Sequence, residues 1–296
     1  MVSTKTLFVL ATTIASAAAQ STPDIATLLN NPNLSTLKSL VTQYPELISA
    51  LGGAKDLTVF APSDDAFAKI ATSEEFKALA GDAEAVENLL KYHVLGAKVN
   101  AAAVTASGVI GDTLLVDYPV WANLSGDPQV IKATKANNEV VISSGLGAKS
   151  KVTQADVAFT NGVAHIIDAV LTPPVSVSKT AVEADLTKLV EALTKANLVS
   201  TVDSLNKVTI FAPNDEAFGK LTSTPSDEDL EKILTYHVIA GTVGYSPELK
   251  DNTKLKTVNG QELTIRVQDG KVTVNGANVV AADVFTNNGV VHVIDT

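Results

Sequence analysis

The sequence contains the same three motifs twice, in the same order. Residues 58–67, Thr-Val-Phe-Ala-Pro-Ser-Asp-Asp-Ala-Phe, return at 209–218 as Thr-Ile-Phe-Ala-Pro-Asn-Asp-Glu-Ala-Phe. The motif Leu-x-Tyr-His-Val occurs at 90–94 and 234–238, and Asn-Gly-Val-x-His-x-Ile-Asp at 161–168 and 288–295. A length of 296 residues fits about two domains of roughly 150 residues each. The duplication therefore predicts two copies of one domain.

The two copies differ in length. Phe60 and Phe211 are 151 residues apart, whereas His165 and His292 are 127 apart, so the second copy is shorter. Additional residues of the first copy are expected near 120–129, in a surface loop that holds the only tryptophan, Trp121. We predict a first domain at 20–172, a short stiff linker at 173–178, and a second domain at 179–296.

The N-terminus is typical of a secretory signal peptide. In residues 1–19 the only charge is Lys5, an apolar stretch follows, and three alanines precede Gln20. No later segment is apolar enough to predict a membrane span. We therefore expect a secreted protein of the extracellular space or cell wall. Asn33-Leu34-Ser35 and Asn123-Leu124-Ser125 are acceptor sequences for glycosylation in such a pathway.

Composition excludes several classes of function. A net charge of −10 without a basic run argues against nucleic acid and anionic membrane surfaces as partners. The absence of cysteine excludes disulfides, thiol catalysis and thiolate metal sites. There is no Gly-x-Ser-x-Gly motif, so we expect no catalytic residues, no metal and no cofactor, and we predict that the chain is not an enzyme.

Hydrophobic periodicity predicts mixed secondary structure in each copy. Short amphipathic helices are expected between 25 and 51, and a further helix at 83–92. Strands are expected at 57–60, 114–116, 130–131 and 140–142, and in the second copy at 263–267 and 272–274. In the repeated ten-residue motif, Ser63 and Asn214 are expected to cap a helix whose first turn carries two acidic residues, which explains these acids without catalysis.

The three motifs together resemble the fasciclin domain, in two tandem copies covering about residues 22–296. The short layout with a leader is most similar to secreted fungal members. The resemblance implies an α+β fold in which each domain is a twisted β-sandwich wedge with packed helices. It also implies adhesion or association with matrix or cell wall, through an extracellular protein or a cell-wall polysaccharide, and no enzyme activity.

The resemblance also implies candidate partner-binding residues. In animal members the Tyr-His segment and an Asp-Ile pair are associated with integrin binding. The matching residues here are Tyr92, His93, Asp156 and Val157 in the first copy, and Tyr236, His237, Asp283 and Val284 in the second. Valine replaces isoleucine in both pairs, which departs from the integrin motif. Trp121 is a further candidate, with packing against the sheet as the alternative.

The four histidines fall on apolar faces of their predicted elements, because His93 and His237 follow a leucine stripe and His165 and His292 alternate with Val and Ile. A structural role, with each ring bonded to a backbone carbonyl or loop, is the main interpretation. Sensing of pH and metal ligation remain as alternatives. For the whole chain, the alternative to a binding protein is a carrier of a small apolar ligand between helices and sheet.

Overall fold

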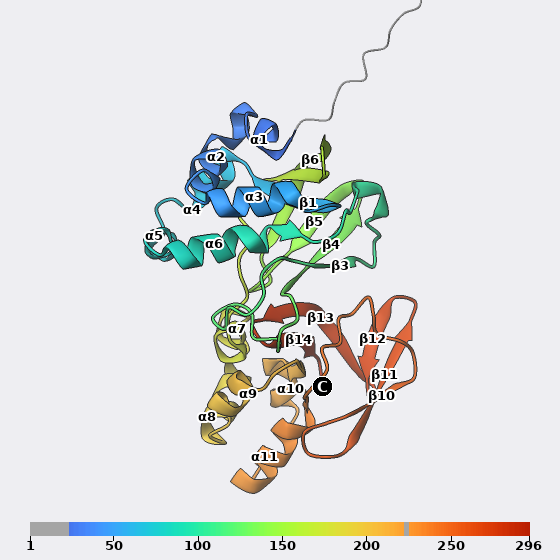
Figure 1. The fold of residues 1–296 in the computed structure, drawn as a ribbon. Helices are drawn as coiled ribbons and strands as arrows, with labels where there is room; N and C mark the ends of the chain where they lie inside the picture. The colour runs from blue at the N-terminus through green and yellow to red at the C-terminus, as the bar shows by residue number, and fades with distance from the viewer. Residues whose placement is uncertain (1–23, 222–224) are drawn as a thin grey trace, which may run out of the picture.

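The computed structural model describes residues 24–221 and 225–296, so the predicted signal peptide lies outside the described part. Within it the chain forms two α+β domains, stacked one above the other in Figure 1 with the helices of each on one side and the strands on the other. The predicted fold class is therefore observed in both copies.

The first domain contains α1 (Ile25–Leu28), η1 (Pro32–Leu34), α2 (Ser35–Val41), α3 (Pro45–Gly53), β1 (Leu57–Pro62), α4 (Asp64–Ile70), α5 (Glu74–Ala80), α6 (Ala83–Tyr92), β2 (Val94–Leu95), η2 (Ala101–Ala103), β3 (Val109–Asp112), β4 (Val130–Ala136), β5 (Glu139–Ser143), β6 (Lys149–Phe159) and β7 (Gly162–Ile167).

The second domain contains α7 (Val177–Glu183), α8 (Thr187–Lys195), α9 (Val199–Ser204), β8 (Val208–Pro213), α10 (Asp215–Gly219), α11 (Asp227–Tyr236), β9 (Val238–Ile239), β10 (Thr253–Lys256), β11 (Glu262–Gln268), β12 (Lys271–Val274), β13 (Ala277–Thr286) and β14 (Gly289–Ile294).

The two sheets have matching strand orders. In the first domain the order is β2-β1-β7-β6-β5-β4-β3, and in the second it is β9-β8-β14-β13-β12-β11-β10. All pairings are antiparallel except β1 with β7 and β8 with β14. The repeated first and third motifs therefore lie side by side at the centre of each domain.

The central strands of each sheet are buried on both faces, and because side chains alternate along a strand, successive residues enter different cores. In β1, Val59 and Ala61 belong to the core against the helices, whereas Phe60 belongs to the core between the sandwich strands. The second domain repeats this division with Ile210 and Ala212 on one side and Phe211 on the other. The alternation explains why these motifs read as continuous apolar runs.

The repeated ten-residue motif forms a strand followed by a capped helix, as expected. The Ala66 N–H donates to Ser63 Oγ at 3.2 Å, and the Ala217 N–H donates to Asn214 Oδ1 at 2.8 Å. Asp64 also accepts from the N–H of Thr36 at 2.7 Å, which together with Ser35 lowers its pKa to about 2. This carboxylate joins two helices and has a structural role.

Two local predictions need correction. Residues 114–116 form no strand; the edge strand is β3, and the chain then enters a loop, residues 113–129, that leaves the sheet to contact the second domain. The predicted linker at 173–178 overlaps α7, where Val177 is 1% exposed within the second core. In both segments the apolar residue packs into the core of its own domain, Leu115 in the first and Val177 in the second, and periodicity within one segment does not report such packing.

Candidate functional site

Asp156 and Asp283 occupy equivalent turns in β6 and β13. Each has a positive φ, 56° and 60°, at a shift in strand register. This left-handed conformation is more accessible to aspartate than to most residues, because its short polar side chain bonds locally. Asp156 Oδ1 accepts from Ala101 N–H at 2.9 Å, and Asp283 Oδ1 accepts from Ser246 N–H at 2.7 Å. Aspartate is therefore suited to the bulge in both domains.

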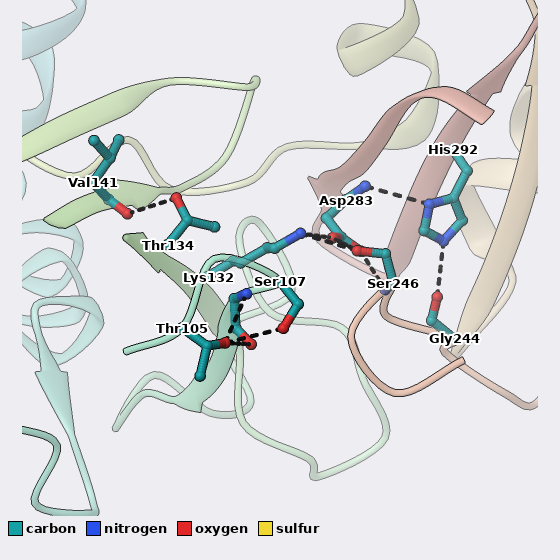
Figure 2. Close-up of polar contacts among 10 residues, drawn as sticks. Thr105, Ser107, Lys132, Thr134, Val141, Gly244, Ser246, Asp283 and His292 are labelled. Atoms are coloured by element: carbon teal, nitrogen blue, oxygen red, sulfur yellow. Dashed lines mark hydrogen bonds and ion pairs between the residues drawn. The ribbon is translucent and has the colours of Figure 1, made fainter. Parts of the chain in front are cut away.

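A histidine holds each bulge from the neighbouring strand. The Asp156 N–H donates to His165 Nδ1 at 3.3 Å, and His165 Nε2 lies 2.9 Å from the Val99 carbonyl oxygen. His292 repeats this geometry with Asp283 N–H at 3.3 Å and the Gly244 carbonyl at 2.8 Å, as Figure 2 shows. With Nδ1 accepting, Nε2 carries the proton. Burial lowers the pKa of His292, which keeps the ring neutral.

His93 and His237 cap the C-termini of α6 and α11. His93 Nδ1 donates to the Leu89 carbonyl at 2.8 Å, and its Nε2 accepts from the Leu171 N–H at 2.9 Å. Burial lowers the pKa of His93 to about 4. His237 Nδ1 bonds the Ile233 carbonyl at 2.7 Å, and burial lowers its pKa as well. These contacts are the ones expected of structural histidines.

The two tyrosines before these histidines are placed differently. Tyr92 is fully buried, its hydroxyl donates to the Val130 carbonyl at 3.1 Å, and burial raises its pKa. Tyr236 is half-buried, and its hydroxyl bonds Asn275 Nδ2 at 2.5 Å. A partner therefore has access to the second Tyr-His segment but not to the first as the domain is folded.

A buried ion pair joins the domains. Lys132 extends from β4 of the first domain to Asp283 of the second, with Nζ 2.6 Å from Oδ2 (Figure 2). The Lys132 side chain is 14% exposed and that of Asp283 is 1% exposed. Ser246 Oγ bonds both groups. Because the pair has hydrogen bonds as well as opposite charge, its removal from water is compensated.

An apolar cluster lies beside this ion pair. Its members come from both domains: Val130 from the first, and Tyr245, Phe285 and Val290 from the second, with Ile110 and Val243 at its edge. The rings of Tyr245 and Phe285 make an edge contact with centroids 5.9 Å apart. Burial raises the pKa of Tyr245. The domains therefore share a small hydrophobic core.

The loop at 113–129 completes the contact between the domains. Gln129 is fully buried, and its amide donates to the Thr286 carbonyl at 3.1 Å. The Asn123 N–H donates to the Asn287 carbonyl at 2.6 Å, and Asn287 Nδ2 donates to the Pro119 carbonyl at 2.9 Å. We call the Lys132–Asp283 pair, the apolar cluster and these loop contacts the domain seam. It fixes the two domains relative to each other.

Trp121 packs within its own domain. It is half-buried against the sandwich core, its ring meets Tyr118 edge-on with centroids 5.2 Å apart, and its carbonyl accepts from Gln129. The valines that follow Asp156 and Asp283, Val157 and Val284, are both half-buried. Each packs against the core between sheet and helices in its own domain. The predicted partner-binding residues are therefore spread over several surfaces, and Asp156 is the exposed acidic member.

Sequence reasoning missed the residues of the domain seam. Lys132, Gln129, Tyr245, Ser246, Phe285 and Asn287 were not singled out. A signal exists in the difference between the repeats, because Tyr245, Ser246 and Phe285 occupy the positions of Asn100, Ala101 and Ala158. At two of these positions an aromatic residue, Tyr245 or Phe285, replaces a small or polar one on an otherwise equivalent surface, which indicates a buried contact.

Other predicted features can be placed in the described part of the chain. Asn33 is exposed, whereas Asn123 is half-buried at the domain seam. Among residues 24–221 and 225–296 no group of His, Asp and Glu is arranged to hold a metal ion, and no helix there is long and apolar enough to cross a membrane.

Two apolar cavities of the first domain hold about 20 and about 10 Å³. Such volumes admit a water molecule at most, not a lipid.

The fold and the paired motifs define a tandem pair of α+β domains in which each of the four histidine rings bonds the backbone. The fasciclin domain family matches residues 32–173 and 184–296, and the chain belongs to this family. It is 31% identical over 274 residues to the fasciclin-like arabinogalactan protein elcF of Phaeosphaeria nodorum, covering 92% of this chain and 86% of that protein.

Two further proteins are similar over most of the chain. A fasciclin-like arabinogalactan protein of Arthroderma benhamiae is 31% identical over 268 residues, covering 89% of this chain and 63% of that protein. A solved FAS1 domain pair from the insect cell adhesion molecule fasciclin I aligns with 90% of this chain and 96% of its own, at 20% identity and a TM-score of 0.42.

Proposed function

We propose that this chain is a secreted, glycosylated binding protein that associates with the cell wall or extracellular matrix through a protein or polysaccharide. Two fungal relatives bear the name fasciclin-like arabinogalactan protein, and arabinogalactan is a polysaccharide. The arrangement of three histidines supports binding rather than catalysis, because both ring nitrogens of His93, His165 and His292 are bonded to the backbone and neither is left for proton transfer.

One observation carries the choice of contact surface. The equivalent turns differ in accessibility: Asp156 is exposed on the first domain, and Asp283 is 4% exposed within the domain seam. The first turn is therefore the candidate partner contact, together with its neighbour Val157. Tyr92 and His93 are buried and bond Val130 and Leu89, so we assign them to the support of α6 and β4 and not to the contact surface. The domain seam presents both domains to a partner at fixed spacing, which favours simultaneous contacts.

The test is a pull-down of the purified chain with insoluble wall and matrix fractions of the producing organism, with glycans intact and enzymatically removed. Asp156→Asn keeps the backbone conformation and removes the charge, and we expect it to reduce the bound fraction several-fold. Asp269→Asn is the matched control, because Asp269 is also exposed with a positive φ of 50°. Binding to none of the fractions contradicts the function, and equal loss in both variants contradicts the surface.

A further inference from the structure

The first domain has a polar groove where its helices meet the ends of the central strands. The groove holds about 520 Å³, which lies within the range of about 300–1,000 Å³ typical of small-molecule sites. Its lining includes Asn33 from η1, Asp65 and Lys69 from α4, Thr153 and Gln154 from β6, and Asp168 after β7. Asn33 is exposed and is the asparagine of the glycosylation acceptor Asn33-Leu34-Ser35. A glycan attached to this side chain therefore begins at the groove.

The groove offers hydrogen-bonding groups that the described protein atoms leave unused. Within residues 24–221 and 225–296, neither the Asp65 carboxylate nor the Gln154 amide makes a side-chain hydrogen bond, and both residues are exposed. Asp64 and Asp168 add two further carboxylates, and Lys69 Nζ donates to the Asp168 carbonyl at 2.6 Å. Carboxylates accept hydrogen bonds from hydroxyl groups, and an amide both donates and accepts. The groove therefore suits a neutral ligand rich in hydroxyl groups better than an anion.

The strand side of the groove is polar in the first domain alone. Gln154 and Ala281 have equivalent places in the pairing of β6 with β7 and of β13 with β14, so Thr153 corresponds to Val280. The first domain thus has a hydroxyl and an amide where the second has two apolar side chains, and Val280 is 56% exposed.

The acceptor asparagine is also confined to the first copy. The Thr36 N–H donates to Asp64 Oδ1, and the Lys188 N–H makes the equivalent bond to Asp215 Oδ1. Three residues earlier in each copy lie Asn33 and Asp185, and an aspartate accepts no N-linked glycan. The acceptor and the polar strand positions therefore occur together in one domain and are both replaced in the other.

We propose that the first N-acetylglucosamine of a glycan on Asn33 occupies this groove. Its hydroxyl groups donate to Asp65, and its acetamide group bonds the Gln154 amide. The sugar thereby connects η1, α4 and β6, which come from three separate parts of the first domain, and stabilises their packing. The inference rests on the proposed function in one respect, that the chain is secreted and glycosylated.

The experiment compares the chain made in a eukaryotic secretory host with the chain made in a bacterial host that adds no glycan. Mass spectrometry measures occupancy of Asn33, which we expect to be glycosylated in the eukaryotic host. There, Asn33→Gln is expected to lower the midpoint of thermal unfolding by about 2–4 °C. In the bacterial protein the same substitution is expected to leave the midpoint unchanged. Endoglycosidase H leaves the first sugar attached, so trimming is expected to preserve the higher midpoint.

A double-mutant cycle tests the contact with the strand. Gln154→Ala is expected to lower the midpoint of the glycosylated chain by about 1–2 °C through loss of a hydrogen bond to the sugar, and to have no effect when combined with Asn33→Gln. Gln268→Ala is the matched control, because Gln268 is an exposed strand glutamine of β11 in the second domain. Its effect is expected to be the same with and without Asn33→Gln.

Three results would overturn the proposal: an unmodified Asn33, an equal midpoint for the unaltered chain and Asn33→Gln from the eukaryotic host, or an equal effect of Gln154→Ala in both backgrounds. A midpoint that falls on trimming also contradicts it, because the stabilisation then comes from the outer sugars. The wall pull-down measures a bound fraction and not a midpoint, so it tests the proposed function separately.

Discussion

Asp156 and Asp283 have the same backbone conformation and the same histidine partner, yet one lies at the surface and the other between two domains. The shared contacts maintain the bulge in each sheet and therefore belong to the fold. The surroundings of the carboxylate differ, because Lys132 and Ser246 approach Asp283, and among the described contacts Asp156 has no lysine partner. The repeated motif thus gives both aspartates the same backbone geometry, and the neighbouring residues determine whether the carboxylate is exposed or buried.

The first prediction tests this difference directly. Asp283→Asn removes the negative charge and leaves the Lys132 ammonium buried without a counter-charge, so we expect a loss of about 3–5 kcal/mol in the free energy of unfolding. Asp156→Asn, at the exposed equivalent, is expected to change that free energy by less than about 0.5 kcal/mol. Urea unfolding of both variants measures the effect, and similar losses contradict the assigned roles.

The second prediction tests the apolar part of the domain seam. Tyr245→Asn introduces the residue present in the first domain, and loss of the buried ring is expected to cost about 2–3 kcal/mol. Calorimetry should then show the domains unfolding in two separate transitions. The reverse change, Asn100→Tyr, lies at an exposed position and should have an effect within about 0.5 kcal/mol. A single unchanged transition in Tyr245→Asn would falsify the coupling.

The third prediction concerns pH and compares His93 with His237. The folded pKa of His93 is about 4, below the ordinary value of 6.5, so the unfolded chain binds the proton more strongly. The neutral, buried His93 ring therefore contributes its full stability above pH 6.5. As the pH falls from 6.5 to about 4, the free energy of unfolding decreases by about 1.4 kcal/mol per pH unit. Between pH 7 and 5 the loss is about 2 kcal/mol.

His93→Gln separates the effect of His93 protonation on stability from that of other titrating groups. The glutamine amide can donate to Leu89 and accept from Leu171 without binding a proton. It should flatten the dependence of stability on pH between 7 and 5. His237→Gln is the comparison, since His237 is half-buried and should contribute less. A profile that keeps its full slope in His93→Gln argues against the assignment.

Much of the fold follows from local sequence patterns. The helix predicted at 83–92 is observed with these bounds, because Val86, Leu89 and Leu90 form one apolar stripe; the structure shows in addition that Asp82 caps its start. The strand and capped helix of the repeated motif were also predicted correctly. These features depend on residues within one segment, where periodicity and capping are sufficient evidence.

The domain seam could not be predicted in this way. Asp283 has the same local sequence context as Asp156, and its burial depends on Lys132, which is 151 residues away in the chain. Tyr92 likewise shares its motif with Tyr236, and its burial depends on residues from other segments of its own domain, among them Leu115 and Leu171. Such contacts are set by tertiary packing, so comparison of the two repeats is more informative than either repeat alone.

The central parallel pair in each domain determines how the molecule responds to a pulling force. Leu57 to Pro62 in β1 is in register with Gly162 to Ile167 in β7, and both strands run in the same direction. A force that separates the start of β1 from the end of β7 acts along the strands, so it loads all six paired positions together rather than one after another. The same arrangement of β8 and β14 gives the second domain this shear geometry.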